Sequence, residues 1–131
     1  MNVRPFESPL VVHFSSATVD RVEEREGVQV AYDERGRIVD VAVRAKCGPA
    51  RVDFVESGAG AFPARVTYDS QADAIAVDLD DSPYNGSDEI APGFIVDRDG
   101  EGFVRGIEFL NASDVFSEEA MSGVRKRAIL L

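Results

Sequence analysis

Apolar and polar residues alternate along most of the chain, which is the pattern of half-buried β-strands. In the first such segment, Leu10, Val12 and Phe14 point to one side, and the residues between them point to the other. The same period of two recurs in residues 28–32, 39–43, 66–68, 75–79, 94–96 and 107–109. The pattern therefore predicts about seven strands, and we expect the first three to form an antiparallel meander.

The second half of the chain resembles the first when the sequence is compared with itself. At an offset of 66, residues 27–43 align with residues 93–109 without gaps, and the opening strands align at an offset of 65. Four identities fall in this alignment: Gly27 with Gly93, Val30 with Val96, Asp33 with Asp99, and Gly36 with Gly102. The alternative is that part of this match arises by chance, because any two hairpins share the alternation of apolar and polar residues. The alignment predicts two related antiparallel β-meander repeats, a degenerate one in residues 9–47 and a second in residues 65–114.

Helices are expected at few places. Ser117 is placed to cap a helix whose first turn is acidic and whose last turn is basic, so we expect a C-terminal helix and tail over residues 114–131. Residues 50–57 fit either a strand or a short helix, and the repeat favours the helix. Residues 58–63 are typical of a linker. The fold class predicted from these segments is α+β, mainly β, with one or two short helices in a single compact domain over residues 1–131.

Composition excludes several classes of function. The chain has 131 residues and a net charge of -10, which repels a nucleic-acid backbone. No apolar run approaches the roughly 20 residues of a membrane span, and the N-terminus lacks a secretory signal. We therefore expect a cytoplasmic protein that binds neither nucleic acid nor membranes. One cysteine, Cys47, and one histidine, His13, leave little material for a disulfide, a zinc site or a catalytic triad.

Several short motifs follow one another in the second half of the chain. They are Tyr68-Asp69, Ala72-Asp73-Ala74, Pro92-Gly93, Gly106-Ile107-Glu108 and Ala112-Ser113. In this order they closely resemble the YuzE-like family of small prokaryotic proteins, a domain of unknown function. The resemblance covers residues 65–114 and implies a compact, strand-rich α+β module without established activity or catalytic residues.

A candidate metal site lies in the segment that begins at Asp97. Asp97, Asp99, Glu101 and Glu108 have the spacing of acidic ligands in a calcium loop. These carboxylates predict a site for Ca²⁺ or Mg²⁺. The alternative is a hairpin turn, because strands rather than helices flank the segment and because Asp and Gly tolerate turn geometry.

Two further polar groups have both functional and structural interpretations. Carboxylates in and after the strand at 75–79 could raise one another's pKa and serve acid–base chemistry or hold Mg²⁺, or they are simply the solvated face of that strand. They are Asp78, Asp80, Asp81, Asp88 and Glu89. Tyr68, Asp69 and Asp73 form either a small polar site or a packed tyrosine whose hydroxyl bonds to a turn carboxylate.

The hypothesis favoured by the sequence is a non-enzymatic module for self-association or protein interaction. Val11, Ile95 and Leu110 are apolar at outward positions, which indicates a covered second face, as in a homodimer. A variant of this hypothesis is an acidic protein that masks a basic partner. The alternative is an acidic protein that binds a metal ion or a small cationic ligand, with or without enzymatic activity. No catalytic motif or organic cofactor site is visible in the sequence.

Overall fold

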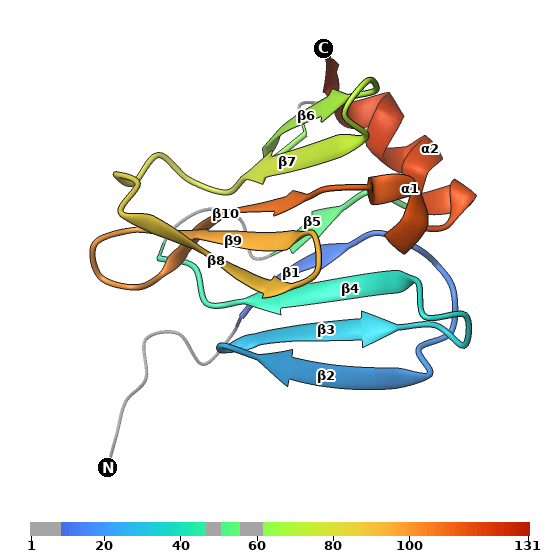
Figure 1. The fold of residues 1–131 in the computed structure, drawn as a ribbon, viewed down its shortest axis with the longest axis horizontal. Coiled ribbons are helices and arrows are strands. Elements are labelled where there is room, and N and C mark those ends of the chain that lie inside the picture. Colours follow the sequence, from blue (N-terminus) through green and yellow to red (C-terminus); the bar gives the residue numbers. More distant parts are fainter. Residues whose placement is uncertain (1–8, 47–50, 56–61) are drawn as a thin grey trace.

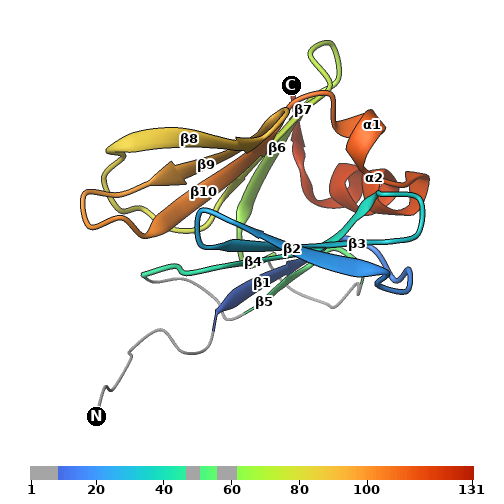
Figure 2. The same cartoon turned by 60° about the horizontal axis from the view of Figure 1, so that its bottom comes forward.

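The strands form two sheets that face each other in the computed structural model, which describes residues 9–46, 51–55 and 62–131 (Figures 1 and 2). Strands make up 46% of the described residues and helices 12%, so the predicted class, mainly β with short helices, is confirmed. The five-stranded sheet contains β1 (Leu10–His13), β2 (Arg21–Arg25), β3 (Val28–Tyr32), β4 (Ile38–Val43) and β5 (Arg51–Asp53), in the order β2-β3-β4-β1-β5.

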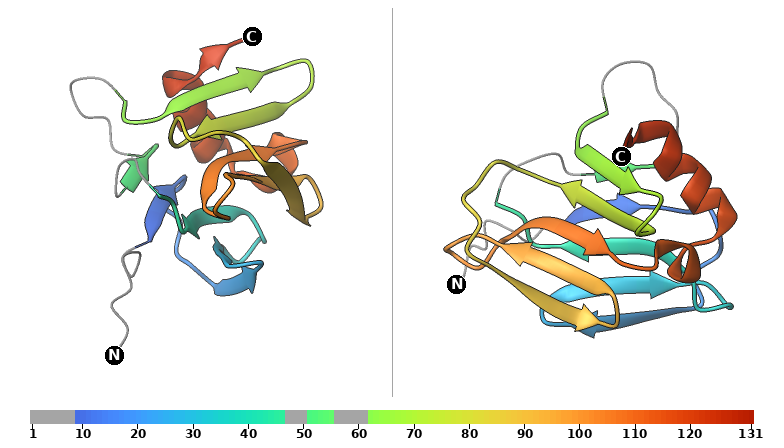
Figure 3. Two further views of the ribbon diagram at one scale, coloured as in Figure 1. Left: turned by 90° about the vertical axis from the view of Figure 1, so that its left-hand side faces the viewer. Right: turned by 45° about the horizontal axis from the view of Figure 1, so that its top comes forward.

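The six-stranded sheet has the order β11-β6-β7-β10-β9-β8. Its strands are β6 (Arg65–Asp69), β7 (Ala74–Asp78), β8 (Gly86–Ala91), β9 (Phe94–Arg98), β10 (Val104–Phe109) and β11 (Ile129–Leu130). Helices α1 (Ala112–Val115) and α2 (Glu118–Arg127) lie together at one end of the two sheets (Figures 2 and 3). No helix in the described part of the chain is long and apolar enough to cross a membrane.

Four strands of each sheet have the same order and the same pairing. The order β2-β3-β4-β1 in one sheet corresponds to β8-β9-β10-β7 in the other. Val30 pairs with Val41 in the first sheet, and Val96 pairs with Ile107, 66 residues later, in the second. The ladders β3–β4 and β9–β10 also each contain one register shift.

The prediction that the first three expected strands form a meander is wrong, because these strands are hydrogen-bonded in a different order. β1 pairs with β4 rather than β3, and the meander consists of β2, β3 and β4. The apolar pattern did not predict β2, because β2 lies at a sheet edge and its charged residues are exposed or half-buried on both faces. The pattern did not predict β8, the edge strand of the other sheet, for the same reason.

Residues 51–53 form strand β5, so the helix favoured for residues 50–57 is wrong. β5 pairs parallel with β1, and the N–H of Phe54 donates to the His13 carbonyl at 2.9 Å. Val52 and Phe54 are buried, so the segment uses the period of a strand. A partner strand distant in sequence decided between two conformations that the local pattern allowed. Residues 58–61 of the predicted linker, and Cys47, lie outside the described residues.

Helix α2 has the cap that the sequence predicts. The Oγ of Ser117 accepts a hydrogen bond from the Ala120 N–H at 3.2 Å, with acidic residues in the first turn and basic residues in the last. Glu119 in that first turn accepts hydrogen bonds from the Ser15 and Ser16 hydroxyls at 3.1 Å and 2.6 Å. These bonds fasten the helix to the five-stranded sheet, although the chain enters the helix from the six-stranded one.

Candidate functional site

The predicted calcium segment contains the hairpin turn between β9 and β10. Oδ1 of Asp99 accepts hydrogen bonds from the N–H groups of Glu101 and Phe103 at 2.8 Å and 3.0 Å. Gly102 has φ 89°, a left-handed conformation that favours glycine. Asp99 therefore bonds to its own turn, as the hairpin alternative predicts, although its buried Oδ2 has no partner among the described residues. Glu101 points away and forms an ion pair with Lys46.

Asp97 and Glu108 lie together on the outer face of the six-stranded sheet. Asp97 is on β9 and is only 6% exposed, and its Oδ1 accepts a hydrogen bond from the Ser87 hydroxyl on β8 at 2.6 Å. The Ser87 hydroxyl also lies 2.8 Å from the hydroxyl of Tyr84. Glu108 is on β10 and forms a side-chain hydrogen bond with Asp97. Two of the four predicted ligands are thus brought together, and the other two are not.

Asp78, which the sequence placed in a different cluster, joins this pair. It lies on β7, directly opposite Gly106 of β10, and Gly106 in turn lies opposite Asp97 of β9. A Cβ built on Gly106 would meet Asp97 Oδ2 at 3.4 Å and Asp78 Oδ1 at 3.5 Å. The missing side chain at Gly106 therefore lets carboxylates on the two neighbouring strands approach each other. We call Asp78, Asp97 and Glu108 the carboxylate group.

Negative charge accumulates in the carboxylate group. The pKa of Glu108 is raised to about 7. Its hydrogen bond with Asp97 is the largest cause, followed by burial of the carboxyl and by repulsion from the charges of Asp97 and Asp78. Among the described residues, no group of three or more His, Cys, Asp or Glu side chains is arranged to hold a metal ion. The geometry favours a proton held between Asp97 and Glu108 over the calcium site that the spacing of the four acidic residues predicts.

The raised pKa of Glu108 has a consequence for the stability of the fold. A carboxyl whose pKa is higher in the folded than in the unfolded protein makes stability fall as the pH rises between the two values. We expect the free energy of unfolding of the wild-type protein to fall between about pH 4.5 and about pH 7, as Glu108 ionises. Glu108→Gln cannot ionise, so its free energy of unfolding should fall by about 1 kcal/mol less over that range, after allowance for the solvent exposure of Glu108. Urea denaturation across this pH range measures the difference.

Glu119→Gln is the control with the opposite sign. The pKa of Glu119 is lowered, chiefly by the hydrogen bond from the Ser16 hydroxyl, so ionised Glu119 stabilises the fold. Its replacement should therefore cost more stability at neutral than at acid pH. If wild type and Glu108→Gln show the same pH profile, Glu108 does not hold a proton at neutral pH.

The other carboxylates of the second predicted cluster bond separately. Oδ1 of Asp80 accepts a hydrogen bond from the Ser82 N–H at 2.8 Å. Asp88 forms an ion pair with Arg98 at 2.9 Å, and Glu89 accepts a hydrogen bond from the Gly93 N–H at 2.9 Å. Asp81 is exposed. Only Asp78 of this cluster belongs to the carboxylate group, and the remainder serve turns or the surface of β8.

The tyrosine–aspartate motif has a structural role. The Tyr68 hydroxyl donates to Asp73 Oδ1 at 2.9 Å, and Asp73 Oδ2 accepts from the N–H and hydroxyl of Ser113 at 3.0 Å and 2.5 Å. Asp73 thereby fastens the β6–β7 turn to the start of α1. The packed tyrosine, rather than a small polar site, is what the structure contains.

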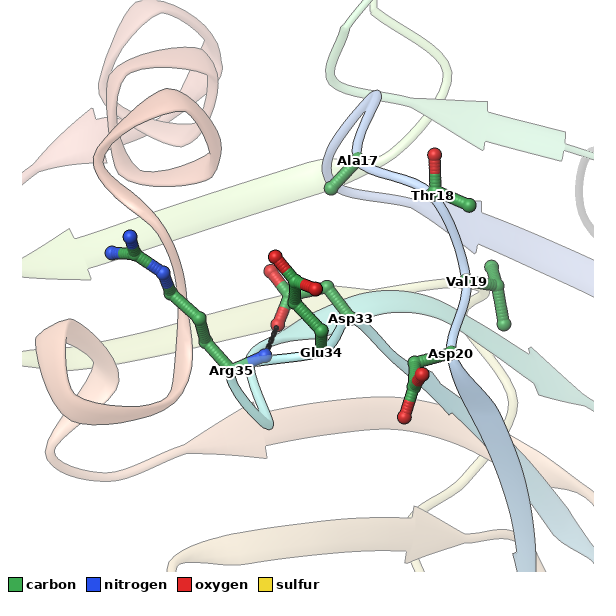
Figure 4. Close-up of a pocket in the computed structure, with 7 residues that line it drawn as sticks. All are labelled: Ala17, Thr18, Val19, Asp20, Asp33, Glu34 and Arg35. Atoms are coloured by element: carbon green, nitrogen blue, oxygen red, sulfur yellow. Dashed lines mark hydrogen bonds between the residues drawn. The ribbon is translucent and has the colours of Figure 1, made fainter.

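An open hollow of about 350 Å³ lies on the other half of the molecule (Figure 4). The loop between β1 and β2 and the turn between β3 and β4 line it. The lining residues are Ala17, Thr18, Val19, Asp20, Asp33, Glu34 and Arg35. Oδ1 of Asp33 accepts hydrogen bonds from the N–H groups of Arg35 and Arg37, both at 2.9 Å, so Asp33 stabilises its turn. The hollow contains none of the predicted site residues.

Sequence reasoning did not predict Tyr84, Ser87 or Gly106 as parts of the site. Tyr84 and Ser87 belong to a loop and an edge strand without a periodic pattern. Gly106 did carry a usable signal, because a glycine inside a strand often marks a position where another group approaches closely.

The outward apolar residues are partly accessible: Val11 and Ile95 are half-buried, and Leu110 is 41% exposed.

Known proteins offer one point of comparison. Searches of curated proteins and of solved structures found no match. Residues 65–113, which include the whole carboxylate group, match the model of the family described as Protein of unknown function (DUF2283).

Proposed function

We propose that this chain is a non-enzymatic interaction module that binds a basic segment of a partner protein on the outer face of its six-stranded sheet. The observation that carries the proposal is a group of three carboxylates without an ion pair in the described part of the chain, although Arg65 lies opposite Asp78 on the neighbouring strand β6. Within the described residues, no lysine or arginine forms an ion pair with any of its three members, whereas Arg98 and Lys46 pair with carboxylates outside the group. A lysine or arginine from a partner would offset the charges of Asp97 and Asp78, which add to the effects of the hydrogen bond with Asp97 and of burial on the pKa of Glu108.

The surroundings of Glu108 suit a long basic side chain. Ala76 on β7 and Ile95 on β9 lie directly opposite Glu108, one on each side. Leu110 follows two residues later on the same face and is exposed. Lysine and arginine have apolar stems that pack on such surfaces while the charged end stays near a carboxylate. The arrangement therefore favours a basic side chain over a small inorganic cation.

We also infer an internal duplication, which makes the first half of the chain a control for the second. The support is the shared strand order and the pairing at constant offset in the two sheets. At the positions that correspond to Asp78, Asp97 and Glu108, the first half has His13, Ala31 and Ala42. The shared strand arrangement thus forms without the carboxylate group, which favours a functional reason for these three residues.

The charge of the whole chain acts in the same direction. A net charge of -10 attracts a basic partner at long range and repels acidic ones. Attraction of this kind gives fast association and weakens as salt is added. The carboxylate group would then supply the local specificity that net charge alone does not.

A lysine–alanine repeat peptide is a suitable probe for this proposal. We expect Asp78→Asn combined with Glu108→Gln to weaken its binding about tenfold, measured by fluorescence anisotropy at low salt. The matched control is Asp20→Asn combined with Glu34→Gln, which makes the same two types of substitution beside the hollow of Figure 4. This control should change the affinity less than about twofold.

Two results would contradict the proposal. Equal weakening by both double variants would mean that only net charge attracts the peptide. Unchanged binding in the Asp78→Asn/Glu108→Gln variant would mean that the peptide binds elsewhere. Circular dichroism of each variant excludes loss of fold as the cause.

A further inference from the structure

Strand β11 forms an apolar free edge of the six-stranded sheet. It pairs parallel with β6 on one side, and no strand in the described ranges lies on its other side (Figure 3). Ile129 is 50% exposed and Leu130 is 62% exposed, and Leu131, which follows the strand, is also exposed. An open strand edge with apolar side chains is a template for pairing with another strand.

The backbone of Leu130 points toward this free edge. The N–H of Leu131 donates to the Tyr68 carbonyl of β6 at 2.9 Å. Because successive residues of a strand direct their N–H and C=O groups to alternate sides, the groups of Leu130 point away from β6. One donor and one acceptor are therefore presented side by side at the edge.

We propose that a second copy of this chain pairs with β11 in antiparallel orientation, with the two-fold axis at Leu130. In that register each Leu130 donates its N–H to the carbonyl of the partner's Leu130 and accepts the reciprocal bond, as in a hydrogen-bonded antiparallel pair. Ile129 then lies opposite the partner's Leu131. Every cross-strand pair is apolar, so the edge is self-complementary and the two six-stranded sheets become continuous.

The other sheet edges in the described part of the chain are less suited to self-pairing. β2 carries ion pairs of Glu23 with Arg21 and Arg25, β8 carries acidic side chains, and β5 carries the ion pair of Arg51 with Asp53. Charged edges of this kind oppose association. Among the described strands, β11 is therefore the sheet edge best suited to pairing with a second copy.

The expected dimer is weak. A stable interface buries about 1,200–2,000 Å² in total, and a few apolar side chains from each copy cover only part of that area. We therefore expect a dissociation constant in about the micromolar to millimolar range. Arg125, Lys126 and Arg127 in the last turn of α2 precede the edge, so added salt should leave the dimer unchanged or strengthen it.

Sedimentation velocity of the whole chain, from about 1 µM to about 1 mM, tests this inference. We expect dimer formation to weaken at least tenfold in Leu130→Lys, which places two charges at the axis. Leu130→Pro should act in the same direction, because it removes the outward N–H but leaves the bond from Leu131 to Tyr68. The control is Val22→Lys, a change at the β2 edge of a residue that is 60% exposed, and it should leave the dimer intact.

The inference goes beyond the proposed function, and the two can fail separately. Asp78→Asn combined with Glu108→Gln should dimerise like wild type, and Leu130→Lys should bind the basic peptide like wild type. A wild-type protein that stays monomeric to about 1 mM, or a dimer that Val22→Lys disrupts and Leu130→Lys does not, would overturn the proposed pairing.

Discussion

Replacing Phe14 by alanine is expected to lower the free energy of unfolding by about 3–5 kcal/mol. Phe14 is fully buried, and its ring centroid lies 5.1 Å from Phe54, 5.6 Å from Phe109 and 4.5 Å from Phe116. Phe14 and Phe54 directly follow β1 and β5, Phe109 ends β10, and Phe116 lies between α1 and α2. The substitution therefore opens a cavity where both sheets and the helical end meet.

Urea denaturation followed by circular dichroism measures this loss. Because domains of this kind have a total stability of about 5–15 kcal/mol, the variant should be close to unfolding. Tyr84→Ala is a matched aromatic control: Tyr84 is 60% exposed, and its loss should cost less than about 1 kcal/mol. If Phe14→Ala were as mild as this control, the two sheets would not share one core.

Replacing Gly123 by alanine is expected to destabilise the protein by about 2 kcal/mol. In an exposed helix the same change normally stabilises by about 1 kcal/mol, because alanine has the higher helix propensity. Here a Cβ on Gly123 would lie 2.6 Å from the carbonyl oxygen of Phe54, which is backbone and cannot rotate away. Helix α2 must move off the five-stranded sheet to make room.

Thermal and urea denaturation of Gly123→Ala test the close approach of α2. The control is Gly100→Ala, in the β9–β10 turn, where nothing lies within 4 Å of the added Cβ. It should change the stability by less than about 0.5 kcal/mol. A stabilised Gly123→Ala variant would show that α2 does not pack this tightly on the Phe54 segment.

The sequence predicted the elements whose signals are local. Strands with one buried face, such as β4, have a period of two because side chains alternate between core and solvent. The Ser117 cap depends only on residues within one helical turn. Asp99 likewise bonds to N–H groups two and four residues ahead.

Elements that lack a buried face, or that depend on a distant partner, were not predictable in this way. β2 is charged because it lies at a sheet edge, so its sequence has no apolar pattern. β5 is a strand because it pairs with β1, and its own few residues do not distinguish a strand from a helical turn.

The candidate site shows the same division. The sequence grouped carboxylates by closeness along the chain, which placed Asp97 with Asp99 and Asp78 with Asp80. Alternation puts such neighbours two apart on one face of a strand, but the hairpin turn at Asp99 ends that alternation and folds its side chain onto its own backbone. The carboxylate group forms instead across β7, β10 and β9.

The sequence by itself determined the mainly β class, the capped C-terminal helix and the hairpin turns, because each depends on contacts within a few residues. The tertiary structure alone decided the order of the strands, the parallel pairing of β5 and the meeting of Asp78, Asp97 and Glu108 around Gly106. The physical reason is register: hydrogen bonds between strands distant in sequence decide which side chains become neighbours, and no local pattern encodes that alignment.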